Sequence, residues 1–142
     1  MAVKFDAILD KLREKDTDSD TESFIAACSD ETTALTAGTD KVTFRMPYAF
    51  TLTSVTASLT TAGTGANLVT VDINEGGATI LTTKITIDAT ETTSTTAAAQ
   101  PVIGGAGPAL ASDAQMTIDI DQIDSGGVSA GLKVTLIGHQ TV

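Results

Sequence analysis

The stretch DIDQID, residues 119–124, places three carboxylates close together near the end of a predicted strand. Asp119 and Asp121 alternate along the chain, so a strand directs both to one outward face, and Asp124 follows at its end. Carboxylates on one face repel each other unless a cation or a basic partner lies between them. One hypothesis is therefore a calcium site completed by loop oxygens. The alternative is a solvated strand face whose charges protect a sheet edge from aggregation.

A second acidic stretch, DTDSDTE at residues 16–22, begins like the D-x-D-x-D opening of a calcium-binding loop. The similarity ends there, because the sixth loop position is Thr21 rather than glycine and the twelfth is Ala27 rather than glutamate. A solvated acidic linker is the better interpretation. For Asp72 and Glu75, on another predicted hairpin, plain surface is an equally good interpretation.

The sequence contains no motif for nucleophilic catalysis. His139 is the single histidine and lies close to the last residue, and no G-x-S-x-G sequence provides a serine nucleophile for it to activate. Cys28 follows an apolar stretch, so we expect a small buried thiol, and one cysteine cannot form a disulfide within the chain. We therefore expect no enzymatic activity, no catalytic residues and no cofactor. A metal-dependent enzyme at Asp119, Asp121 and Asp124 is the least favoured alternative.

The charge of the chain excludes some partners. Its net charge is −10, with only 8 basic residues against 18 acidic ones. Without a basic patch the chain is not expected to bind nucleic acid or an anionic membrane surface. Charged residues interrupt every apolar run near the N-terminus, so we expect neither a signal peptide nor a membrane-spanning helix.

Most of the sequence has the composition of β-structure. The chain contains 26 threonines, 12 glycines and no tryptophan, and aromatic residues make up only 4%. Threonine, valine and isoleucine favour the half-buried surface of a sheet, and glycine marks turns. We therefore predict an all-β domain over residues 23–142, an antiparallel, jelly-roll-like β-sandwich of about eight strands.

The N-terminal part, residues 1–22, reads differently. Apolar residues of the stretch VKFDAILDKLREK recur at helical spacing and form one stripe, Phe5, Ile8, Leu9 and Leu12. A helix over residues 3–15 of this length is marginal in water and needs a surface to pack on. We predict a short α-helix followed by the acidic linker, the two together acting as an anchor, with the stripe as its partner-binding residues.

Several local features of the predicted domain can be read from parity and turn chemistry. Strands are expected near residues 22–28, 40–46, 50–60, 67–74, 79–88, 92–98, 101–104, 115–123 and 131–138. Apolar parity changes near Thr53-Ser54, which predicts a bulge, and Met46-Pro47 should end a strand. Gly76-Gly77 should form a hairpin turn. Residues 102–112 look like a loop, and 115–123 and 131–138 are expected to pair.

The stretches KVTFRMPYAFTLTSVTASLTT, VDINEGG, MTIDIDQI and GLKVTLIG together resemble a module common in structural proteins of tailed bacteriophages and prophages. The resemblance covers about residues 28–139, and FDAILDKLREKD resembles the leader on some such proteins. It implies a location in the virion after assembly in the bacterial host cytoplasm. It carries over no catalytic residue.

The resulting functional hypothesis is a non-enzymatic virion structural protein on the particle exterior, either a capsid decoration (cement) protein or a short head or tail appendage. Its partners would be other virion proteins, such as the major capsid protein or tail and fibre proteins, and homo-oligomers, especially trimers, are expected. The alternative is a receptor- or glycan-binding module of a tail fibre. Tyr48 and four phenylalanines are the only aromatics, which disfavours that alternative because sugar sites often stack on exposed rings.

Overall fold

The computed structural model describes residues 20–105 and 107–141 of the chain. The predicted N-terminal helix and its apolar stripe, Phe5, Ile8, Leu9 and Leu12, lie outside these residues. Within the described part the fold is all-β, as the composition predicts. Its elements are β1 (Glu22–Ala27), β2 (Gly38–Arg45), β3 (Phe50–Ser58), β4 (Val69–Glu75), β5 (Ala78–Thr79), β6 (Leu81–Thr83), β7 (Ile85–Ile87), the 3-10 helix η1 (Ser94–Thr96), β8 (Val102–Ile103), β9 (Ala109–Leu110), β10 (Gln115–Gln122) and β11 (Lys133–Gln140).

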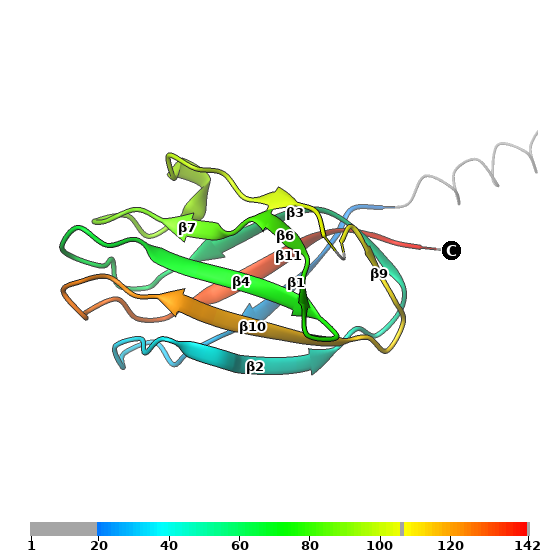
Figure 1. The fold of residues 1–142 in the computed structure, drawn as a ribbon, viewed down its shortest axis with the longest axis horizontal. Coiled ribbons are helices and arrows are strands. Elements are labelled where there is room, and N and C mark those ends of the chain that lie inside the picture. The colour runs from blue at the N-terminus through cyan, green and yellow to red at the C-terminus, as the bar shows by residue number, and fades with distance from the viewer. Residues whose placement is uncertain (1–19, 106, 142) are drawn as a thin grey trace, which may run out of the picture.

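Two antiparallel sheets form the sandwich-like body. The first sheet has the order β1-β11-β3-β9. The second has the order β2-β10-β4-β5, and β7 pairs with β4 beside β5. Figure 1 shows β2, β10 and β4 in front of β1, β11 and β3, and a small third sheet joins β6 to β8. Strands β1 and β2 are therefore edge strands on the same side of the two main sheets.

Alternating apolar side chains of the two sheets meet between them. Strand β10 is the clearest case, since Met116, Ile118 and Ile120 are 0–1% exposed, as their parity predicts. The opposing sheet contributes side chains of β3 and β11 that are 0–3% exposed: Phe50, Leu52, Val55, Ala57, Val134 and Leu136. Burial of such side chains stabilises the fold by roughly 1.5–3 kcal/mol each.

The predicted bulge in β3 is present at Thr53. Pairing with β11 shifts there, from Ser54 opposite Ile137 to Leu52 opposite Gly138. The extra residue reverses the parity, so that Phe50 and Leu52 before it and Val55 after it all face the core. Gly138 lies where the backbones come close, because a Cβ on it would be 2.1 Å from the Thr51 carbonyl oxygen.

The predicted turn at Gly76-Gly77 also forms. Both glycines have positive φ, 57° and 85°, and they connect β4 to β5. Strand β2 ends at Arg45, directly before Met46-Pro47, as expected.

The prediction of one strand over 79–88 is wrong. The Thr79 hydroxyl accepts a hydrogen bond from Leu81 N at 3.1 Å, so the chain bends there. The segment consequently divides into β5 and β7, which pair with β4, and β6, which pairs with β8.

Three other expectations are corrected by the structure. Residues 92–98 contain the 3-10 helix η1, whose N-cap Thr93 accepts a hydrogen bond from Thr95 N. Strand β8 confirms the strand expected near 101–104, but residues 102–112 are not all loop, because they also contain β9, which pairs with β3. Strands β10 and β11 do not pair: β10 lies between β2 and β4, and β11 between β1 and β3, so the connection between them crosses from one sheet to the other.

Candidate functional site

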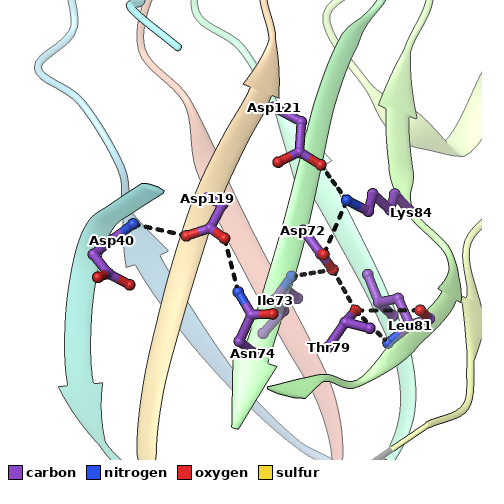
Figure 2. Close-up of polar contacts among 9 residues, drawn as sticks. All are labelled: Asp40, Asp72, Ile73, Asn74, Thr79, Leu81, Lys84, Asp119 and Asp121. Atoms are coloured by element: carbon purple, nitrogen blue, oxygen red, sulfur yellow. Dashed lines mark hydrogen bonds and ion pairs between the residues drawn. The ribbon is translucent and has the colours of Figure 1, made fainter. Parts of the chain in front are cut away.

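Polar side chains gather on the outer face of the second sheet, away from the core. We call this group the outer-face cluster; its members are Asp40, Asp72, Asn74, Thr79, Lys84, Asp119 and Asp121 (Figure 2). Its centre follows from register, because Asp119 of β10 lies directly opposite Asp72 of β4. Like charges in this position repel, so their neighbours must compensate them.

Lys84 compensates one side of the cluster. Its ammonium lies 3.1 Å from Asp72 Oδ2 and also contacts Asp121 Oδ2. The hydrogen bond to Asp121, followed by that to Asp72, raises the pKa of Lys84 above its ordinary value despite the opposing effect of burial. Asp72 is only 5% exposed, so this cation neutralises a carboxylate that has little access to water.

The other oxygen of Asp72 has protein donors of its own. The Thr79 hydroxyl donates to Asp72 Oδ1 at 2.6 Å, and Ile73 N donates to the same atom at 2.9 Å. The Thr79 hydroxyl therefore binds the buried carboxylate at the residue where the chain bends toward β6. The side chain of Asp72 thus fixes the path of the chain after the β4–β5 turn.

Asp119 compensates its charge differently. Its Oδ1 accepts a hydrogen bond from Asp40 N at 2.7 Å, and its Oδ2 accepts one from Asn74 Nδ2 at 3.0 Å. Asp40 has a φ of 50°, in the left-handed region that non-glycine residues rarely adopt. The carboxylate of Asp119 therefore holds the irregular start of β2 against β10.

Asp124 lies apart from the outer-face cluster and binds the loops at one end of the sandwich. It is 2% exposed and accepts hydrogen bonds from Thr64 N at 2.9 Å, Val128 N at 3.2 Å and Ser129 N at 3.1 Å, together with the Ser129 hydroxyl. Burial alone would raise its pKa, but these donors outweigh it and hold the pKa of Asp124 well below the ordinary 3.8.

The three carboxylates of the sequence-predicted cation site therefore have separate partners. Asp121 pairs with Lys84, Asp119 binds an amide group and a backbone N–H, and Asp124 binds the loop donors. In residues 20–105 and 107–141, no group of three or more histidine, cysteine or acidic side chains is placed to hold a metal ion. In the same residues every buried side-chain nitrogen or oxygen has a hydrogen-bond partner.

Sequence reasoning missed Asp72 and Lys84. The interpretation of Asp72 as plain surface is wrong, because the bend at Thr79 covers it. One available signal is that Lys84 is one of only four basic residues after residue 22. A rare cation in an acidic domain is a natural partner for a carboxylate that cannot reach water.

The two residues with nucleophile or base chemistry lie elsewhere. His139 is in β11 opposite Thr51, near the strand's end. Cys28 is 7% exposed, as predicted, and burial raises the pKa of its thiol to about 11. A thiol with so high a pKa is a poor nucleophile near neutral pH.

A second feature is an apolar groove between the edge strands β1 and β2, with a volume of about 380 Å³. Its lining residues are Phe24, Ile25, Ala26, Val42, Phe44, Arg45, Pro47 and Leu136. Phe24 also contacts Phe50 and Tyr48, with ring centroids 5.1 and 5.9 Å apart, so one wall of the groove packs against the core. Ile25 is 67% exposed, and Arg45 pairs with Asp113 at 3.8 Å near the surface.

Comparison of the chain with protein-family models, with curated proteins and with solved structures gives no match. Among the described residues, no helix is long and apolar enough to cross a membrane.

Proposed function

We propose that this chain is a non-enzymatic structural protein on the exterior of a phage particle, either a capsid decoration (cement) protein or a short head or tail appendage. The observation that carries the structural role is the internal pairing of the outer-face cluster. Lys84, Asn74, Thr79 and backbone donors occupy the carboxylates of Asp72, Asp119 and Asp121, and these contacts hold neighbouring strands together. Polar groups used in this way stabilise a scaffold and leave no poised acid–base pair in the cluster.

A jelly roll is the fold we propose for this scaffold. Strand order supports it, because the chain passes repeatedly between the two main sheets. Strands β1, β3, β9 and β11 belong to one sheet, and β2, β4, β5, β7 and β10 to the other. Two antiparallel sheets between which the chain alternates are the architecture of jelly rolls, which occur in viral capsid proteins.

The particle itself is proposed from the resemblance of residues 28–139 to tailed-phage structural proteins. A decoration protein at a three-fold position would clamp several capsid subunits by adding buried surface without chemistry. Other virion proteins would be its partners, and a homotrimer its assembly. An acidic, well-packed β-domain suits an exposed position because net charge opposes aggregation.

Imaging of purified particles tests this proposal. A tagged full-length chain, produced in the strain that encodes it, should copurify with phage particles and be visible on the head or tail by electron microscopy. Treating the same lysate with a tagged unrelated acidic protein controls for trapping. Full-length chain that stays in the soluble fraction while particles assemble normally would contradict a virion role.

The groove between β1 and β2 favours a second candidate, a receptor- or glycan-binding module of a tail fibre. Phe24 and Phe44, both partly buried, line it and are aromatic rings of the kind on which sugars stack. The full-length chain on a glycan array distinguishes the candidates. Saturable binding lost on Phe44→Ala, in a variant that still unfolds cooperatively, would favour the fibre module.

A further inference from the structure

We propose that the groove between β1 and β2 is the seat of the chain's own N-terminal segment, residues 3–15, folded back as an amphipathic helix. Phe5, Ile8, Leu9 and Leu12 would fill the groove. This intramolecular contact would exist whether or not the chain belongs to a phage particle. The apolar stripe would then bind a surface of its own chain.

The groove has the character of a surface that a partner covers. Strand β1 is the outermost strand of its sheet, and in the described part of the chain only β11 pairs with it. Apolar side chains from both sheets, among them Phe24, Val42 and Leu136, reach the groove. Exposed edge strands with an apolar flank promote association, and proteins commonly cover them with a helix or loop.

Chain length allows the segment to reach the groove. The described chain begins at Asp20, two residues before β1, and β1 contributes Phe24, Ile25 and Ala26 to the groove. The Tyr48 hydroxyl donates a hydrogen bond to Glu22, which holds the start of β1 beside Pro47 at the groove. The six linker residues 16–21 can span about 20 Å when extended, enough for the chain to reverse direction.

The lengths of segment and groove also agree. A helix over residues 3–15 would be about 20 Å long at ~1.5 Å per residue. Strand β1 has 6 residues, and at ~3.4 Å per residue it has nearly the same length. A helix lying along β1 would therefore place its whole stripe on the groove.

Charge favours the same occupant. Residues 3–15 contain four basic and three acidic side chains, a net charge of +1. Residues 23–142 contain four basic and eleven acidic side chains, a net charge of −7. The net positive segment is thus attracted electrostatically to the net negative domain, while the linker between them carries the repelling charge.

Hydrogen–deuterium exchange of the full-length chain tests this contact, read by mass spectrometry on peptides covering residues 3–15. An isolated helix of this length is marginal, so its amides exchange at nearly unprotected rates unless the segment is docked. Docking should slow their exchange at least ~10-fold. Two pairs of variants are compared: Leu9→Gln on the stripe with the charge-neutral Ala7→Gln off the stripe, and Ile25→Gln at the groove with Val128→Gln, an exposed apolar residue in the connection between β10 and β11.

Leu9→Gln and Ile25→Gln should each remove most of the protection of residues 3–15, and Ala7→Gln and Val128→Gln should leave it unchanged. Because Ile25 is largely exposed, its variant should fold, and unchanged exchange in β10 and β11 verifies this. Unprotected residues 3–15 in the parent chain would overturn the proposal, as would protection insensitive to both Leu9→Gln and Ile25→Gln. Protection that falls on tenfold dilution would also overturn it, because the occupant would then be a second copy. The exchange is also measured with added oligosaccharide. Slower exchange in β1 and β2, with the protection of residues 3–15 unchanged, would overturn the proposal, because the groove would then bind glycans.

Discussion

Replacing Asp124 with asparagine should destabilise the protein in a way that depends on pH. In the native chain Asp124 Oδ2 accepts hydrogen bonds from Thr64 N and Val128 N, at 2.9 and 3.2 Å. Asparagine can present its single oxygen to Ser129, but its amino group then faces those two N–H donors. Each lost bond to a charged acceptor costs about 1.5 kcal/mol, so the free energy of unfolding should fall by about 3 kcal/mol at pH 7. This corresponds to a decrease in Tm of ~10 °C for a chain of this size.

The pH dependence has a definite sign. The folded-state pKa of Asp124 lies below its ordinary value of 3.8, so its contribution to stability is fully present above that value and is lost as pH falls toward the folded-state pKa. The parent chain therefore loses this contribution from about pH 5 downward, by up to ~1.4 kcal/mol per pH unit. Asp124→Asn has no such group, so the stability difference between the two proteins should narrow as pH falls.

Urea unfolding of both proteins at pH 7, 5, 4 and 3 measures this difference. Asp113→Asn is the control, because Asp113 is exposed and its φ of 60° suits asparagine equally well. The control should stay within about 0.5 kcal/mol of the parent chain. Two results would refute this reasoning: a loss below about 1 kcal/mol for Asp124→Asn at pH 7, or a stability difference that is constant from pH 7 to pH 3. Either would show that the hydrogen bonds to the Asp124 carboxylate do not stabilise the fold as described.

Three further predictions concern other parts of the fold. Lys84→Met should lower the free energy of unfolding by about 2 kcal/mol, because it leaves the nearly buried carboxylate of Asp72 without its cation. Adding Asp72→Asn to that variant should restore part of the loss in urea unfolding, and no restoration would argue against charge as the cause. Gly138→Ala should cost about 3 kcal/mol or prevent folding, since its Cβ would lie 2.1 Å from the Thr51 carbonyl oxygen; a native-like Tm would contradict that close approach. Cys28, whose pKa burial raises to about 11, should react with an aromatic disulfide reagent at pH 8 at least ~100-fold more slowly in the folded chain than in urea. Equal rates in both states would show that the thiol is accessible.

Local features of this fold were predictable because their causes lie within a few residues. The parity change at Thr53 predicted a bulge, since the core needs apolar side chains from both halves of β3. Gly76-Gly77 predicted the turn, because both positions need positive φ. The alternation of Met116, Ile118 and Ile120 likewise gave the buried face of β10.

The candidate site was only partly predictable. Its aspartates Asp119, Asp121 and Asp124 stand out in the sequence, but whether they share a ligand depends on which groups other strands bring to them. Lys84, Asn74 and Thr64 reach them from segments more than 35 residues away. Nothing local to DIDQID indicates those partners.

The sequence by itself determined the all-β class of the described domain, most strand positions and the faces that turn inward, because β-propensity and alternation act between near neighbours. Tertiary structure alone decided that β10 and β11 lie in different sheets and that Asp72 is buried. Tertiary pairing also divided residues 79–88 among two sheets. Strand pairing is a choice among distant segments with similar apolar patterns, and it is settled by the combined packing of both sheets rather than by any one segment.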